Sequence, residues 1–131
     1  MPDKSFPDLD SYDELANSKQ IKVLSWNLWW KFENYLDRQN LILSELKELD
    51  PDILCLQEVW EDADNSQAKK ISDLLGCEYI YSKSFEIDGV SFGNAIISKF
   101  PILNSSSHLI PTAVAFNENR TLLHGVVNYN S

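Results

Sequence analysis

The chain has 131 residues, a formal net charge of −9 and 44% hydrophobic residues, including four tryptophans and six phenylalanines. This length and hydrophobic content predict one folded domain with a buried core and exclude a wholly disordered chain. The acidic charge argues against a basic surface that binds nucleic acid by counterion release, although an active site of carboxylates and a metal ion is compatible with it.

The N-terminal segment shows no features of a secretion signal or of a membrane span. Residues 1–20 are polar and acidic and contain Pro2 and Pro7, so we expect a partly disordered lead-in. These residues lack the basic start and apolar run of a signal peptide, and the sequence has no run of roughly 18 apolar residues that could span a membrane. Cys55 and Cys77 lie in apolar segments without metal-ligand spacing, which favours reduced thiols. We therefore expect a cytoplasmic protein.

The first part of the domain has the pattern strand, helix, strand. Residues 21–28 alternate with a period of two and are apolar on both faces near their start, which predicts a central strand. Residues 38–49 carry leucine and isoleucine at helical spacing, and Asp50-Pro51 ends this helix. Residues 53–58 form the strongest apolar strand signal. If the two strands share a sheet, their connection requires a parallel crossover.

The second part of the domain is rich in short strands. A second helix is predicted for residues 66–75, with Gly76 at its C-cap. Residues 86–93 contain turn residues. Four further segments resemble strands, which we expect to pair mostly antiparallel: residues 77–85, 94–102, 106–114 and 120–129.

Polar side chains stand at the ends of the two predicted parallel strands. Asn27 ends the first strand and Glu58 ends the second. Ligand sites form beyond the carboxyl ends of parallel strands. The two side chains would therefore lie about 5 Å apart if the strands are neighbours, or further apart by the width of one strand if another strand lies between them. Amide and carboxylate oxygens suit magnesium, which proteins often hold with one or two carboxylates, water and phosphate oxygens. The alternative is that Glu58 is merely solvated and that Asn27 only contacts its own backbone.

Four segments together resemble the N-terminal half of the endonuclease/exonuclease/phosphatase superfamily: IKVLSWNLWW, PDILCLQEVW, FGNAIISKFPI and RTLLHGVV, within residues 21–128. The most specific element is Leu-Gln-Glu at residues 56–58, placed after Trp26-Asn27 with a helix between. The superfamily includes deoxyribonuclease I-like nucleases, abasic-site endonucleases, sphingomyelinases and inositol polyphosphate phosphatases. The resemblance therefore implies a phosphate-ester substrate, which could be nucleic acid, phospholipid or inositol phosphate.

The resemblance also implies a cofactor and roles for three residues. The family residue that matches Glu58 binds a divalent metal, Mg²⁺ or Mn²⁺, and the one that matches Asn27 supports the metal and the substrate phosphate. Arg120 lies on a strand that matches one bringing a basic side chain near the substrate. From the residues alone, Arg120 could equally form an ion pair with Glu118 at the rim.

The implied fold is an α/β, deoxyribonuclease I-like, four-layer α/β/β/α sandwich, with a mixed sheet and helices on its outer face. Residues 21–131 correspond to its first half. The family's second half supplies a Gly-Asp-x-Asn segment and a Ser-Asp-His segment with the catalytic histidine, and neither occurs here. His108 is expected at the surface and His124 as a hydrogen-bonded structural residue. We therefore expect part of a metal-dependent phosphoesterase that is inactive by itself. The alternative function is a non-catalytic βαβ binding or assembly module.

Two further motifs have simpler interpretations. Trp29 and Trp30 could stack on a substrate, but one in the core and one against the nearby helix is the more ordinary arrangement. Gly93-Asn94 enters an apolar strand without the spacing of a phosphate-binding loop, which favours close backbone packing at this glycine.

Overall fold

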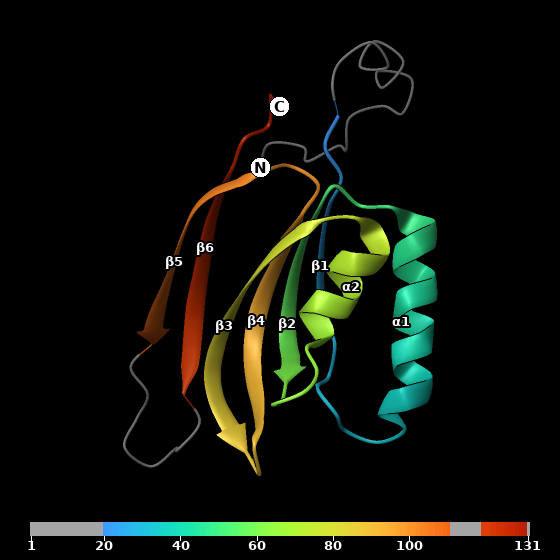
Figure 1. Cartoon of the computed structure of the whole chain (residues 1–131), viewed down its shortest axis with the longest axis vertical. Coiled ribbons are helices and arrows are strands. Elements are labelled where there is room, and N and C mark those ends of the chain that lie inside the picture. Colours follow the sequence, from blue (N-terminus) through green and yellow to red (C-terminus); the bar gives the residue numbers. More distant parts are fainter. Residues whose placement is uncertain (1–19, 111–118, 131) are drawn as a thin grey trace, which may run out of the picture.

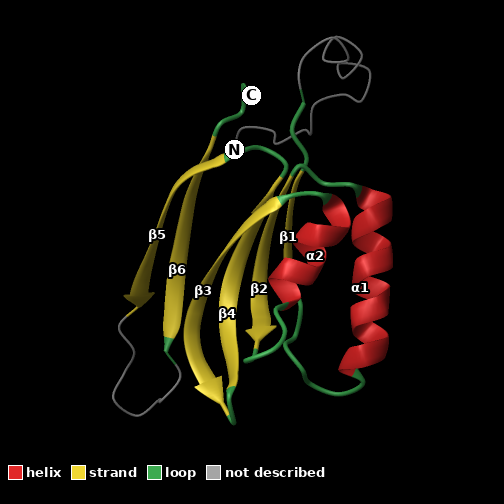
Figure 2. Ribbon diagram, viewed as in Figure 1, coloured by secondary structure: helices red, strands yellow, loops and turns green. Residues whose placement is uncertain are grey.

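The computed structural model describes residues 20–110 and 119–130, which form three layers (Figure 1). The middle layer is a four-stranded sheet with the order β1-β2-β4-β3. Its strands are β1 (Val23–Asn27), β2 (Ile53–Glu61), β3 (Glu78–Ile87) and β4 (Val90–Ser98). Helices α1 (Tyr35–Leu49) and α2 (Gln67–Leu75) cover one face of this sheet (Figure 2). A two-stranded sheet of β5 (Ile102–Ile110) and β6 (Arg120–Val127) lies on the opposite side, against β3 and β4.

Strand pairing confirms the predicted mixed sheet. β1 and β2 are parallel neighbours, from Val23 opposite Ile53 to Asn27 opposite Gln57. The other pairs, β2–β4, β3–β4 and β5–β6, are antiparallel. The strand–helix–strand prediction for the first part of the chain is therefore confirmed. The prediction that residues 21–28 form a central strand is wrong, because β1 lies at the edge of the four-stranded sheet.

Several predicted boundaries are wrong. The second strand continues past residue 58 to Glu61, because a bulge bends it without ending it. The predicted strand 94–102 is divided between β4 and β5, since the chain turns at residues 99–101. The predicted turn at 86–93 shrinks to Asp88 and Gly89, which join β3 to β4 with φ values of 50° and 80°. Positive φ at both central residues matches the twist of a two-residue hairpin.

The two helices begin and end where their capping residues allow. In α2, the Ser66 hydroxyl accepts a hydrogen bond from the Lys69 backbone N–H at 3.2 Å, and Gly76 closes the helix at a φ of 65°. This N-cap and C-cap confirm the second helix almost to the residue. α1 begins three residues before its prediction, at Tyr35, and Asp50 caps its C-terminus by donating its backbone N–H to the Leu46 carbonyl.

The main core lies between the helices and the four-stranded sheet. Its buried members come from both helices, from β2 and β4, and from the residue after β1: Leu28, Ile42, Leu46, Leu54, Leu56, Val59, Ala68, Ile71, Ala95 and Ile97. Burial of this apolar area holds the helical layer against the sheet. Neither helix among the described residues is both long and apolar enough to cross a membrane.

Some predictions concern residues outside the described ranges. Nearly all of the predicted lead-in, residues 1–19, lies there, as do residues 111–114 of a predicted strand. Glu118, the alternative partner of Arg120, also lies outside the described residues.

Candidate functional site

Asn27, Glu58 and Arg120 line one pocket of about 320 Å³. They reach it from β1, β2 and β6, so the pocket is built by both sheets. The rest of its lining is polar except for one ring and one glycine: Gln57, Ser84, Phe92, Gly93, Asn94 and Thr121. The structure therefore brings together all three residues that the sequence singled out.

A bulge in β2 turns Glu58 toward the pocket. Leu54 and Leu56 face the core, so strict alternation along the strand would direct Glu58 into the core as well. Leu56 pairs with Ala95 and Val59 pairs with Gly93, so Gln57 and Glu58 together stand opposite a single residue of β4. Glu58 adopts a φ of 51° at this bulge. One extra residue thus moves the carboxylate from the core face to the pocket.

The expectation that Glu58 ends its strand is therefore wrong, while that for Asn27 is confirmed. Asn27 is the last residue of β1, and Glu58 lies three residues before the end of β2. β2 continues because Val59 and Trp60 resume the pairing with β4 after the bulge. Both polar residues still face one pocket, since the bulge reorients the strand at this point.

The Asn27 side chain is held by a local hydrogen bond. Its Oδ1 accepts the Trp29 backbone N–H at 2.9 Å, which is the backbone contact of the simpler interpretation. An amide oxygen has two lone pairs, so this bond leaves one for a ligand. The local contact and the ligand role are therefore compatible, and the bond fixes the direction in which the amide points.

Behind the pocket, hydrogen bonds join the two sheets. Asn94 Nδ2 donates to the Thr121 carbonyl at 2.8 Å, and the Thr121 hydroxyl lies 3.1 Å from the Ser84 hydroxyl. Ser82 donates to the Thr121 hydroxyl at 3.2 Å and also contacts the Ser107 hydroxyl. These bonds fix β6, and hence the backbone of Arg120, relative to β3 and β4.

Phe92, which lines the pocket, belongs to a stack of aromatic rings. Phe92 stacks on Trp30 with centroids 4.2 Å apart and on Phe85 with centroids 4.6 Å apart. The Arg120 guanidinium carbon lies 5.8 Å from the centre of the Phe85 ring, within the range of a cation–π contact. Trp29 is 48% exposed and Trp30 lies against Phe92, so the expected placement of one tryptophan in the core is wrong. The expected contact with the nearby helix is present, because the guanidinium carbon of Arg38 in α1 lies 5.0 Å from the centre of the Trp29 ring.

Gly93 in β4 allows residues of β3 to pack closely against the backbone at this position. A Cβ at this position would lie 2.3 Å from the Ser82 carbonyl oxygen and 2.6 Å from the Tyr81 ring, which supports the predicted close packing. The Tyr81 hydroxyl donates to the Val59 carbonyl at 3.3 Å and lies 2.6 Å from the Ser91 hydroxyl. Burial raises the pKa of Tyr81 to about 12, because the charged phenolate would lose its hydration.

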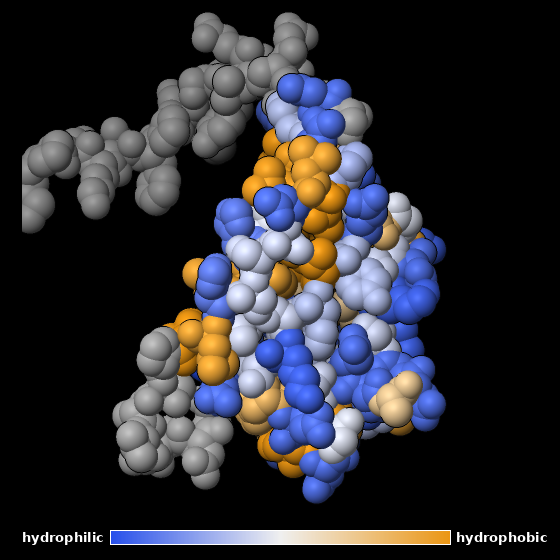
Figure 3. Space-filling model, turned by 60° about the vertical axis from the view of Figure 1, so that its left-hand side comes forward, coloured by the Kyte–Doolittle hydropathy of each residue, from blue (hydrophilic) through white to orange (hydrophobic). Residues whose placement is uncertain are grey.

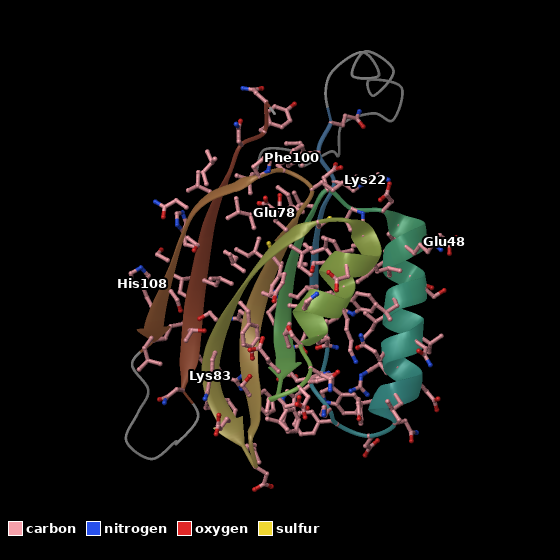
Figure 4. The ribbon with its side chains drawn as sticks, in the orientation of Figure 1. Lys22, Glu48, Glu78, Lys83, Phe100 and His108 are labelled. Atoms are coloured by element: carbon pink, nitrogen blue, oxygen red, sulfur yellow. The ribbon has the colours of Figure 1, made fainter. Side chains whose placement is uncertain are left out.

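The histidines and cysteines lie away from this lining. His108 projects from β5 at the outer side of the molecule (Figure 4), as the sequence predicted. His124, expected as a hydrogen-bonded structural residue, is also exposed, because it alternates outward along β6. Cys55 and Cys77 are unbridged, and burial raises the pKa of both thiols.

The sequence analysis missed Arg38. This residue of α1 donates hydrogen bonds to carbonyls of the loop that follows Asn27. From sequence, a single arginine in an amphipathic helix looks the same whether it is solvated or bonded. The acceptors here are backbone carbonyls, which every residue has, so no residue type in the sequence marks them as partners.

The oxygen atoms that line the pocket could supply some of the ligands of a metal ion, with a substrate supplying the others. Among the described residues of the lining, Glu58 is the one carboxylate, and amide and hydroxyl groups supply further oxygens. The described residues contain no group of three or more His, Cys, Asp and Glu that could hold a metal by themselves. Magnesium is commonly held by one or two carboxylates while phosphate oxygens and water complete its shell, so the residues present suit it.

Comparisons with known proteins agree with the fold. Residues 24–123 match the model of the endonuclease/exonuclease/phosphatase family. An inositol phosphosphingolipids phospholipase C from Schizosaccharomyces pombe is 34% identical over 100 residues, which are 74% of this chain and 23% of that protein.

Two solved structures show the same fold. An endonuclease/exonuclease/phosphatase family protein from Leptotrichia buccalis superposes with a TM-score of 0.69 at 18% identity, over 85% of this chain and 50% of that one. The 3′ phosphatase NExo from Neisseria, bound to a product DNA hairpin, gives 0.56 at 23% identity, over 82% and 38% of the two chains. This chain thus spans half or less of the length of these relatives. The matched residues include β1, β2 and the start of β6, and the chain belongs to the endonuclease/exonuclease/phosphatase family.

Proposed function

We propose that this chain carries metal-binding and phosphate-binding residues of a divalent-metal-dependent phosphoesterase. The observation that carries the proposal is the convergence of Asn27, Glu58 and Arg120 on one pocket from three strands. Such a convergence of an amide, a carboxylate and a guanidinium suits a phosphate ester with its counterion.

Each residue has a distinct task in this proposal. Glu58 and the free lone pair of Asn27 Oδ1 would hold Mg²⁺ or Mn²⁺. Magnesium, when bound, polarises the phosphate and stabilises the charge that develops on its oxygens. Arg120 would contact the phosphate with its planar, two-pronged donor group, while its stacking near Phe85 limits the directions in which it can point.

A phospholipid phosphodiester is the substrate class that we would test first. The relative with 34% identity is named for inositol phosphosphingolipids. The net charge of −9 disfavours a long polyanion, because binding nucleic acid depends on many Lys and Arg contacts to phosphates. A nucleic-acid phosphate ester is the second class, and the bound DNA of the Neisseria phosphatase makes it worth including.

We also propose that residues 21–131 form the first half of the family domain and hydrolyse nothing by themselves. No histidine lines the pocket, so its described residues offer no imidazole to accept a proton from water or to protonate a leaving group. The general base would then come from the family's second half.

Metal titration of the 131-residue chain tests the proposal. We expect calorimetry to show Mg²⁺ or Mn²⁺ binding that Glu58→Gln removes, because this change keeps the shape of the side chain and removes its charge. Glu48→Gln is the matched control: it makes the same change on α1, where Glu48 faces solvent away from the pocket (Figure 4). Equal metal affinity in all three proteins would reject the role of Glu58, and a wild-type chain that binds neither Mg²⁺ nor Mn²⁺ would favour the non-catalytic βαβ module.

A longer form of the protein that hydrolyses phosphate esters would test the same residue by kinetics. Glu58→Gln is then expected to lower kcat by about two to four orders of magnitude, since metal-based charge stabilisation is worth several kcal/mol. Unchanged turnover at saturating metal would contradict this role.

A further inference from the structure

One side chain holds the loop between β1 and α1. The Arg38 guanidinium lies beneath residues 28–33 and donates hydrogen bonds to five backbone carbonyls. The acceptors and distances are Leu28 (3.3 Å, from Nε), Trp29 (3.1 Å) and Trp30 (2.9 Å) from Nη2, and Phe32 (2.7 Å) and Glu33 (2.7 Å) from Nη1. Since arginine has five N–H donors, these contacts match its full donor capacity.

The loop has a backbone conformation that is unfavourable for its residues, because several of them that are not glycine have positive φ angles. Trp29, Trp30, Glu33 and Asn34 have φ values of 59°, 47°, 24° and 34°. Residues with a bulky side chain rarely occupy this left-handed region, and each such residue costs free energy that surrounding contacts must offset. The charge-assisted hydrogen bonds of Arg38 provide such contacts, because they draw successive carbonyls of the loop toward one cation.

The same loop is bonded to both proposed metal ligands. The Trp29 backbone N–H donates to Asn27 Oδ1 at 2.9 Å, and the Trp30 backbone N–H donates to the Glu58 carbonyl at 2.9 Å. The orientation of the Asn27 amide and the backbone of the Glu58 bulge therefore both depend on where the two tryptophan N–H groups lie. Arg38 in turn binds the carbonyls of those two tryptophans.

We propose that Arg38 is a positioning residue for this site. By fixing the strained loop, it aims the N–H groups that orient Asn27 and Glu58, although it does not line the pocket itself. Lysine would not replace it, because an ammonium group has three donors at one point and cannot reach five carbonyls spread along a loop. The consequence for metal affinity rests on the proposed function, whereas the effect on the loop does not.

The test compares Arg38→Ala and Arg38→Lys with Leu46→Ala in the 131-residue chain. Leu46 is a buried core residue of the same helix, so its variant lowers overall stability without touching the loop. Hydrogen–deuterium exchange of residues 28–34 reports on the loop, and calorimetry reports on Mg²⁺ affinity. Guanidinium chloride at low millimolar concentration is then added to Arg38→Ala, with ammonium chloride as the control salt.

We expect exchange in residues 28–34 to rise about tenfold or more, and Mg²⁺ to bind about tenfold more weakly, in both Arg38 variants relative to Leu46→Ala. Guanidinium restores both readouts in Arg38→Ala, and ammonium does not. The inference is overturned if Leu46→Ala matches Arg38→Ala in this loop, or if the loop loosens while Mg²⁺ affinity stays that of the wild type. A wild-type chain that binds no Mg²⁺ contradicts the proposed function instead, and exchange of the loop then decides the role of Arg38.

Discussion

Val59 occupies the core position that the alternation of β2 would give to Glu58. The exchange depends on one inserted residue and on the positive φ of Glu58, so a single backbone irregularity both completes the core and supplies the carboxylate of the pocket. A proposed site residue is thus obtained from a strand that also supplies Leu54, Leu56 and Val59 to the core.

Glycine at residue 58 is expected to relieve backbone strain while removing the proposed metal ligand. At a φ of 51°, a side chain with a Cβ is disfavoured, so Glu58→Gly should be about 1 kcal/mol more stable than Glu58→Ala. Both variants lack the carboxylate and are expected to lose Mg²⁺ binding. Urea denaturation measures the difference, and an alanine variant as stable as the glycine variant would show that the bulge is unstrained.

Arg120→Lys is expected to weaken binding of a phosphate group and to leave folding almost unchanged. The planar two-pronged contact is lost, whereas the free energy of unfolding changes by less than about 0.5 kcal/mol at this exposed residue. Titration with inorganic phosphate in the presence of Mg²⁺ measures the first effect and urea denaturation the second. A large loss of stability with unchanged phosphate affinity would make Arg120 a structural residue.

Gly93→Ala is expected to destabilise the protein by about 3 kcal/mol or more, because its Cβ would overlap the backbone of β3. Gly125→Ala provides the comparison. Its Cβ would lie 3.2 Å from the end of the Ile80 side chain and 3.4 Å from that of Ile96, which are flexible, so we expect a cost below about 1 kcal/mol. Thermal and urea denaturation of the two variants would reveal whether close packing at Gly93 is as strict as the distances indicate.

Ionisation of Tyr81 is expected to weaken the fold at alkaline pH. Its pKa is raised from 10.0 to about 12 by burial, so the unfolded chain releases the phenolic proton at lower pH than the folded protein does. The contribution to stability is therefore complete below pH 10 and is lost as the pH rises toward 12. Denaturation at pH 9 and pH 11.5 is expected to show a smaller loss for Tyr81→Phe than for the wild type; equal losses would assign the pH dependence to other groups.

The 131-residue chain is expected to self-associate or to bind a hydrophobic dye, and to show no phosphodiesterase activity. Large apolar side chains are exposed along the two-stranded sheet, among them Leu103 at 64%, Leu109 at 60% and Leu122 at 58%. Figure 3 shows this side of the molecule, where hydrophobic side chains form separate patches toward its upper and lower parts with more polar side chains between them. An uncovered apolar area of ~400 Å² forgoes on the order of 10 kcal/mol, which is comparable to the stability of a domain.

Sedimentation, dye binding and a Mg²⁺-dependent phosphodiesterase assay test this expectation together. Leu109→Ser with Leu122→Ser is expected to reduce dye binding, because both changes remove exposed apolar surface. A compact monomer that binds no dye and hydrolyses substrate would contradict both parts of the prediction.

The order of elements was accessible from sequence, since it depends on local periodicity and on cap residues. The cap residues Ser66 and Gly76 and the parallel pairing of the first two strands are examples. The three residues predicted for the site do line one pocket, and their roles there stay a prediction. The bulge at Glu58 could not be predicted from sequence. The hydrophobic periodicity predicts where a strand lies, but it does not reveal a residue inserted within that strand. The positions of Trp29 and Trp30 were missed for a related reason: the conformation of their loop depends on hydrogen bonds from their backbone carbonyls to Arg38, eight or nine residues away.

The register of β1 bears on the order in which the molecule folds. Val23 pairs with Ile53, and the pairing continues to Asn27 with Gln57, so each partner lies 30 residues further along the chain. β3 and β4, by contrast, are joined by a two-residue turn and can pair without closing a long loop. β1 is also an edge strand. We therefore expect β1 to dock after the antiparallel strands and to detach first during local unfolding, so that Asn27 leaves the pocket while Glu58 remains in an intact sheet.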